Sequence, residues 1–117
     1  MRQKYVINRD GPGKDLTIKE YAIIETKVRK PAAFKTYRGK YTFFCEETYK
    51  GESILKSISD GTTALIDILR TRNFYPIEPY AIKIAETVTM LYNSSDDGPV
   101  ELYFDDVDLV SLDIKGP

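Results

Sequence analysis

The residues of this chain best suited to chemistry are the cations and aromatic rings interleaved between positions 27 and 41. This stretch reads KVRKPAAFKTYRGKY and contains no acidic residue. Its candidate binding residues are Lys27, Arg29, Lys30, Phe34, Lys35, Tyr37, Arg38, Lys40 and Tyr41. Cations neutralise phosphates and rings stack on bases, so this composition is typical of segments that bind single-stranded nucleic acid. The alternative is a solvated loop facing the acidic half of the same protein, which an overall pI near 5.5 favours.

A second candidate is a cluster of carboxylates toward the C-terminal end. Asp105, Asp106 and Asp108 follow a strand-like run, and Asp96 and Asp97 precede it. Carboxylate oxygens are the ligands that Ca²⁺ and Mg²⁺ prefer, so positions 105–108 form a candidate divalent metal site. The spacing lacks the central glycine and the closing glutamate of an EF-hand. The alternatives are turn-forming aspartates in solvent and a docking surface for a basic partner.

Catalytic constellations are limited by what the chain lacks. It has no histidine, which excludes Ser-His-Asp and Cys-His catalysis and nearly all structural zinc sites. Cys45 is the single cysteine, and we interpret it as a small buried residue of a strand. Glu46 and Glu47 follow it and point to opposite faces of that strand, a poor arrangement for acid–base catalysis. The glycine-rich stretch 10–14 lacks the spacing of a P-loop. We expect no catalytic residue and no cofactor.

Charge is segregated along the chain. Residues 1–50 hold twelve Lys or Arg against six Asp or Glu, and residues 51–117 hold five against twelve. The halves therefore carry +6 and −7, which favours head-to-tail pairing between copies or a charged partner. We expect a small non-enzymatic interaction domain that binds a protein or a second copy of itself. Nucleic-acid binding through 27–41 and metal binding near 105–108 are the alternatives.

Length and composition predict one globular domain over residues 1–117. Hydrophobic residues make up 42% and charged residues 30% of the 117 positions, as in ordinary folded proteins. No apolar run approaches the roughly 20 residues that cross a bilayer, and the sequence MRQKYVINRD does not read as a signal peptide. A lone cysteine agrees with a reducing compartment. We therefore expect a cytoplasmic protein without a membrane segment.

The clearest predicted elements are two helical segments. From 52 to 72 the apolar residues keep one face of a 3.6-residue period. They are Ile54, Leu55, Ile58, Leu65, Ile66 and Leu69. Because the period continues across Gly61, it favours one helix over two joined by a turn, at a cost of about 1 kcal/mol for the internal glycine. Pro76 marks the end of this helix, and a second begins near Pro79 and stops at the polar run 93–99.

The remaining segments predict strands. Residues 5–7, 41–45, 100–104 and 107–112 are rich in β-forming residues, and 16–24 alternates with Glu20 on the otherwise apolar face. A helix over 17–25 capped by Asp15 is the alternative for that segment. Strands followed by two helices and further strands indicate an α+β fold, in which a two-helix hairpin covers one face of a largely antiparallel sheet.

Overall fold

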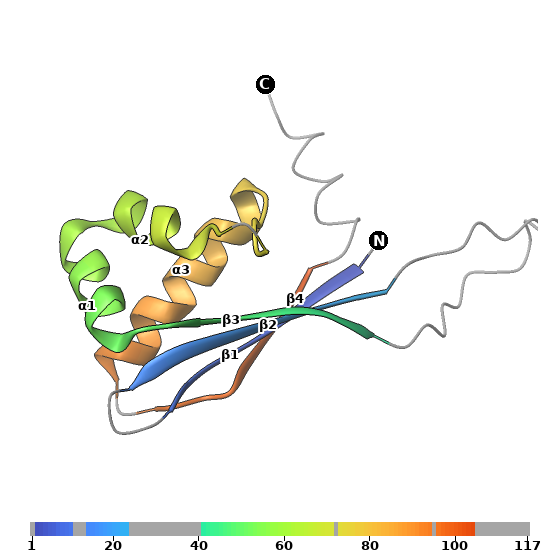
Figure 1. Ribbon diagram of the computed structural model, residues 1–117, viewed down its shortest axis with the longest axis horizontal. Helices are drawn as coiled ribbons and strands as arrows, with labels where there is room; N and C mark the ends of the chain where they lie inside the picture. Colours follow the sequence, from blue (N-terminus) through green and yellow to red (C-terminus); the bar gives the residue numbers. More distant parts are fainter. Residues whose placement is uncertain (1, 11–13, 24–40, 72, 95, 105–117) are drawn as a thin grey trace, which may run out of the picture.

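The computed structural model describes residues 2–10, 14–23, 41–71, 73–94 and 96–104, and it confirms the α+β class. The strands are β1 (Arg2–Asp10), β2 (Asp15–Ile23), β3 (Thr42–Tyr49) and β4 (Val100–Phe104). They form one antiparallel sheet in the order β3-β2-β1-β4. The helices are α1 (Gly51–Asp60), α2 (Thr62–Leu69) and α3 (Glu78–Asn93), and all three lie on one side of the sheet (Figure 1). The strand predicted over 107–112 falls outside the described residues.

The first two strands pair antiparallel as a hairpin, and the side chains of β2 alternate between the core and the opposite face. Arg2 lies opposite Ile23, and the pairing continues to Asp10 opposite Asp15. The β2 side chains at even positions, 16 to 22, are buried, including the carboxylate of Glu20. The strand interpretation of this segment is therefore confirmed, and the alternative helix over 17–25 is wrong.

The prediction of a single helix over 52–72 is wrong, because the helix is interrupted at Gly61. That glycine has φ 120° and ψ 167°, a conformation far from helical and open to glycine alone. Its N–H donates to the carbonyl of Ser57, and its own carbonyl accepts from Leu65. Hydrogen bonding therefore continues through the bend. Ile54 and Leu65 both face the core from the two short helices, whereas Leu55 is exposed, contrary to the predicted face.

The third helix confirms the predicted start near Pro79. Pro79 occupies the first turn, where its missing N–H costs nothing, and Glu78 places an acid at the positive end of the helix dipole. Its buried face includes Tyr80, Ile84 and Leu91. The core between helices and sheet also contains a cluster of aromatic rings from strand, connection and helix. These are Tyr5, Phe74, Tyr80 and Phe104, with Tyr80 and Phe104 stacked at 4.0 Å.

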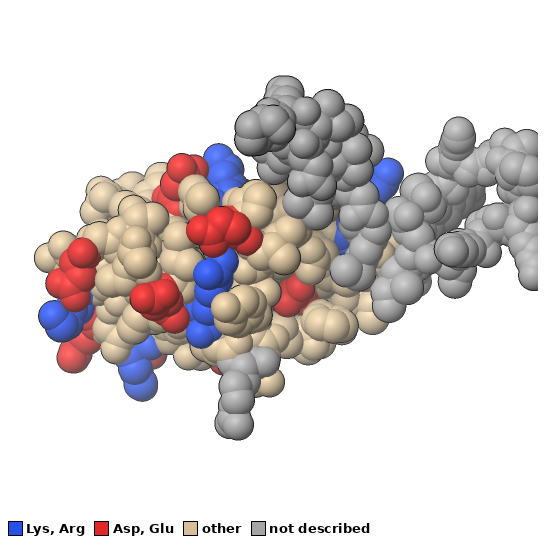
Figure 2. All heavy atoms as spheres, turned by 90° about the horizontal axis from the view of Figure 1, so that it is seen from above, with Lys and Arg blue, Asp and Glu red and all other residues tan. Residues whose placement is uncertain are grey.

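The outer side of the helix layer carries acids and cations side by side. Figure 2 shows them interspersed over the described part of this side. Several form exposed ion pairs, including Lys56 with Asp60 and Arg70 with Glu78. In the described part of the chain, no helix is long and apolar enough to cross a membrane.

Candidate functional site

The two site predictions made from the sequence fall largely outside the part that the structure describes. The basic candidates at positions 27–40 lie there, and so do the carboxylates Asp105, Asp106 and Asp108. Tyr41, the last residue of the basic segment, is described. Among the described residues, no group of three or more His, Cys, Asp or Glu side chains is placed to hold a metal ion.

Tyr41 leads to a surface that the sequence did not reveal, on the side of the sheet away from the helices. Tyr21 of β2 lies opposite Lys4 of β1, and Lys4 lies opposite Tyr103 of β4. On its other side Tyr21 pairs with Phe43 of β3. One register therefore places Phe43, Tyr21, Lys4 and Tyr103 in a line across all four strands, which we term the aromatic row. Because strands lie about 4.8 Å apart, the row spans roughly 14 Å.

The row belongs to the face opposite the core because strand side chains alternate. Tyr5, which follows Lys4, is buried beneath the helices. Phe43 and Tyr103, at the two ends of the row, are 52% and 55% exposed. In Figure 1 the helices lie on the opposite side of these strands. The aromatic row thus stands on a face that no described helix covers.

The rings contact one another and surround the ammonium of Lys4. Tyr21 and Phe43 meet edge to face, with ring centroids 5.7 Å apart, and Tyr41 meets Tyr103 in the same way at 5.9 Å. The Lys4 ammonium lies 4.8 Å from the ring centroid of Tyr21, 5.0 Å from that of Tyr41 and 5.8 Å from that of Tyr103. All three distances fall within the range of cation–π attraction.

Charges around the row are mixed. Lys19 lies opposite Glu46 across β2 and β3. Glu101 accepts a hydrogen bond from the hydroxyl of Tyr103, which raises the pKa of that tyrosine. Tyr103 therefore remains a neutral ring at physiological pH. The row offers neutral π-faces together with one central cation.

The sequence contained part of the signal for this surface. Tyr21, Phe43 and Tyr103 stand at alternate, outward positions of segments predicted as strands. What it did not contain was the strand order, which brings Lys4 next to Tyr103 from the far end of the chain. A register shift between β2 and β3, at Glu20 and Tyr21, also sets which aromatic residue of β3 pairs with Tyr21.

A polar cluster on the core side of the sheet brings a carboxylate and a thiol together. Glu20 is 7% exposed and accepts hydrogen bonds from the amide of Gln3 at 2.7 Å and the hydroxyl of Tyr5 at 3.3 Å. The thiol of Cys45 lies 3.4 Å from the other carboxylate oxygen and 3.1 Å from the carbonyl of Asn73. Burial and then the charge of Glu20 raise the pKa of Cys45 to about 12. A thiol so fully protonated is a poor nucleophile, so the cluster is structural.

The predicted separation of Glu46 and Glu47 is confirmed. Glu46 is exposed, whereas Glu47 turns toward the helices and accepts a hydrogen bond from Thr71 at 3.1 Å. The two carboxylates cannot act on one substrate atom.

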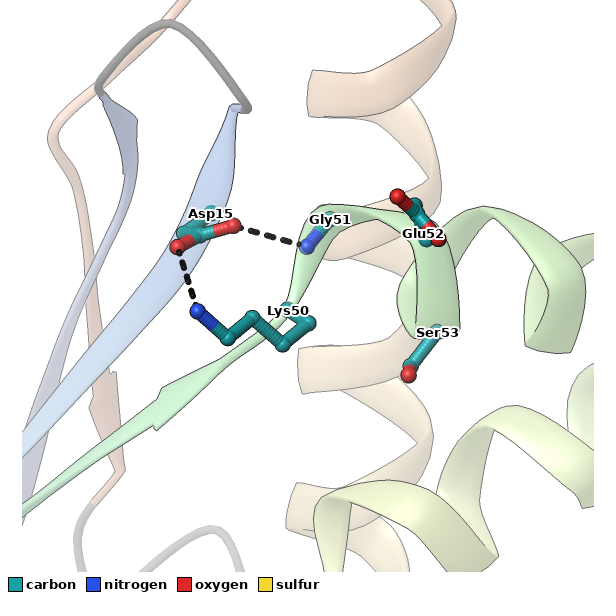
Figure 3. Close-up of a pocket in the computed structure, with 5 residues that line it drawn as sticks. All are labelled: Asp15, Lys50, Gly51, Glu52 and Ser53. Carbon is teal, nitrogen blue, oxygen red and sulfur yellow. Dashed lines mark hydrogen bonds and ion pairs between the residues drawn. The ribbon is translucent and has the colours of Figure 1, made fainter.

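A hollow at the start of α1 was the other candidate. It has a volume of about 470 Å³ and is lined by Asp15, Lys50, Gly51, Glu52 and Ser53. Figure 3 shows the carboxylate of Asp15 accepting the N–H of Gly51, at 2.9 Å, with Lys50 3.9 Å from its second oxygen. A helix N-terminus attracts anions through such free N–H groups. Here a carboxylate of the protein already takes one of them, and Glu52 adds negative charge, so an incoming phosphate is repelled.

Comparison of the chain with protein-family models, with curated proteins and with solved structures finds no match. Function is therefore inferred from the geometry of the aromatic row.

Proposed function

We propose that this chain is a non-enzymatic, cytoplasmic binding module that takes single-stranded nucleic acid on the face of its sheet that no described helix covers. The observation that supports the proposal is the aromatic row, in which three rings and one ammonium share a register across four strands. Known RNA-binding modules stack two or three bases on aromatic side chains of a four-stranded sheet. Stacking tolerates any base, since every base has a π-face.

The charge of the adjoining chain supports the same ligand. The row lies at the end of the sheet where β2 stops at Ile23 and where Tyr41 enters β3. The connection between them, residues 24–40, contains six Lys or Arg and one acid by sequence. Both ends of this cationic connection, at Ile23 and Tyr41, therefore lie beside the row. Local charge of this kind decides attraction at short range, even though the whole protein carries a net charge of −1.

Binding is favoured over catalysis because the polar groups of the described core and its rim are used internally. The carboxylates of Glu20, Asp15 and Asp97 each accept hydrogen bonds from donors of the same chain. The described cysteine is a protonated thiol. A single cysteine also fits the reducing compartment that we propose.

The test is fluorescence anisotropy of the full chain with a labelled single-stranded oligonucleotide at about 50 mM salt. Tyr103→Ala and Phe43→Ala should each weaken binding by about 1 to 3 kcal/mol, or roughly 5- to 150-fold, if these rings stack on bases. Tyr75→Ala is the matched control. Tyr75 is 71% exposed in the connection between α2 and α3, on the helix side of the sheet (Figure 1). Its loss should leave affinity unchanged.

Two outcomes would contradict the proposal. Absence of binding at protein concentrations near 10⁻⁴ M, the weak end of non-specific affinity, would exclude nucleic acid as the ligand. Equal losses from Tyr103→Ala and Tyr75→Ala would show that the row is not the binding surface. If the first outcome is found, a protein ligand on the same face would be the better explanation.

Self-association is a second candidate, favoured by the edge of the sheet. β3 is an edge strand of eight residues. Two adjacent residues of this strand, Phe43 and Phe44, are 52% and 63% exposed. Such an edge can pair with another strand, and the opposite charges of the two halves can add attraction between copies. Sedimentation at about 0.1 M and about 1 M salt tests this, since exposed charge pairs weaken as salt rises. A monomer at low salt and micromolar protein would exclude it.

A further inference from the structure

The central residue of the aromatic row, Lys4, occupies the surface on which a base would stack. Its ammonium lies over the rings of Tyr21, Tyr41 and Tyr103, at 4.8, 5.0 and 5.8 Å from their centroids. Phe43, at the far end of the row, has no such contact among the described residues and is 52% exposed. A ligand therefore finds one ring open and three partly covered by a cation of the protein itself.

A base and an ammonium cannot cover the same ring face. Both are attracted by π-electrons, and both must approach within a few ångströms of the ring plane. Among the described residues, the Lys4 ammonium contacts three aromatic rings and forms no ion pair with a carboxylate. An ammonium displaced from the rings by a base is free to pair with a phosphate of the bound strand, in competition with Glu101 on the same face, whose carboxylate accepts the hydroxyl of Tyr103.

We propose that Lys4 is a displaceable cation, which covers the rings in the free protein and moves to a backbone phosphate when bases stack on the row. The inference rests on the proposed function and adds its mechanism. Binding exchanges three cation–π contacts for base stacking and one ion pair with phosphate. Lys4 thereby opposes stacking of an uncharged ring and favours stacking of a base that carries a phosphate. The row selects nucleotides over other aromatic ligands for this reason.

The exchange predicts an unusual salt dependence for Lys4→Met, which keeps an unbranched side chain and removes the charge. Loss of one phosphate contact should flatten the slope of log K against log salt by about 0.7 on a single strand. The relative affinity of variant and wild type should therefore change about fivefold between 0.1 M and 1 M salt. Because the variant also removes the cation–π attraction that a base must displace, it should bind more weakly at low salt and more tightly near 1 M salt. The plots of log K against log salt for Lys4→Met and for the wild type should therefore cross.

The control is Lys4→Arg, which keeps a cation on the rings and should give a slope equal to that of the wild type. Wild-type binding with parallel lines for Lys4→Met would overturn the inference while leaving the proposed function intact. A flatter line that stays below the wild type up to 1 M salt would likewise overturn the competition for the rings. No binding by the wild type would instead remove the proposed function. These failures are distinguishable in one set of titrations.

A second readout follows the Lys4 side chain directly. Ring currents from the tyrosines should shift the Lys4 ε-methylene protons upfield in the free protein. On addition of the oligonucleotide these NMR signals should move toward ordinary lysine values, in proportion to the bound fraction. Signals that stay upfield at saturation would show that the ammonium remains on the rings, and would overturn the exchange. This measurement needs no variant and is unaffected by changes in stability.

Discussion

The guanidinium of Arg9 is buried against the carboxylate of Asp97, a residue 88 positions later in the chain, with Nη2 2.9 Å from Oδ1. The backbone N–H of Arg9 also donates to the carbonyl of Asp97, at 2.8 Å. The ammonium of Lys14 lies 3.1 Å from the same carboxylate oxygen. Two cations and one acid thus fasten the end of β1 and the start of β2 to the loop that leads into β4.

Acid should weaken this attachment. Hydrogen bonds from Lys14 and Arg9 lower the pKa of Asp97 below its ordinary value of 3.8. A carboxylate whose pKa is lower in the folded state stabilises the protein above the unfolded pKa, and this stabilisation is lost as pH falls through the folded pKa. Asp97→Asn should therefore lower the urea midpoint near pH 7. The difference from wild type should shrink as pH falls from about 4 toward 2.

The control for that experiment is Asp67→Asn, an exposed acid of α2. It should leave the urea midpoint unchanged at both ends of the pH range. A deficit of Asp97→Asn that persists undiminished at about pH 2 would show that the charge of Asp97 does not contribute to stability.

The break between α1 and α2 can be tested by whether one substitution, Gly61→Ala, lowers or raises the stability of the protein. Gly61 has φ 120° and ψ 167°, and a Cβ built there meets nothing within 4 Å. Gly61→Ala should destabilise by about 1 to 3 kcal/mol for conformational reasons alone. In one continuous helix the same change would stabilise by about 1 kcal/mol. A higher urea midpoint in the variant would support the single helix predicted from the sequence and contradict the break at Gly61.

That break shows what the sequence could and could not predict about the helices. Ile54 and Leu65 face the core in either arrangement, so the apolar period reports which side is buried and is insensitive to a bend. Gly61 was visible as a weak point, but its backbone conformation depends on how both helices pack against the sheet. The start of α3 was predictable because Pro79 acts locally, through its fixed φ and missing N–H.

The same distinction holds for the sheet and its face. Local composition and alternation predicted strands over 5–7 and 16–24, which fall on β1 and β2. The aromatic row requires a pairing of Lys4 with Tyr103 that no local pattern encodes. The buried carboxylate of Glu20 looked like an interruption of the apolar face of β2. It became intelligible only when the other strands supplied its donors, Gln3 from β1 and Cys45 from β3.

The buried faces of the short helices make a paired prediction. Leu65 of α2 is 1% exposed in the core, so Leu65→Ala should destabilise by about 2 to 5 kcal/mol. Lys56 of α1 is exposed and, within the described residues, pairs with Asp60 one turn later, so Lys56→Ala should change stability by no more than about 0.5 kcal/mol. Urea melts of both variants give the comparison. Equal effects would mean that the helices present other faces to the sheet.

The contact of Cys45 with Glu20 predicts slow thiol chemistry. Burial, followed by the nearby carboxylate, raises the pKa of Cys45 from 9.0 to about 12. Since the thiolate is the reactive species, alkylation by iodoacetamide near pH 8 should be at least about tenfold slower in the folded protein than in urea. Glu20→Gln removes the charge and keeps the side-chain shape, so it should speed alkylation of the folded protein.

The same substitution at a second nearby carboxylate, Glu47, tests this explanation. Glu47→Gln removes a neighbouring charge that ranks below Glu20 among the causes of the raised pKa, so its effect on the alkylation rate should be smaller. Far-ultraviolet circular dichroism must show both variants folded, because unfolding also exposes the thiol. If folded wild type and unfolded chain react at equal rates, Cys45 is not held as a neutral thiol. If Glu47→Gln accelerates the reaction more than Glu20→Gln, the carboxylate that suppresses the thiolate is not the one that accepts its hydrogen bond.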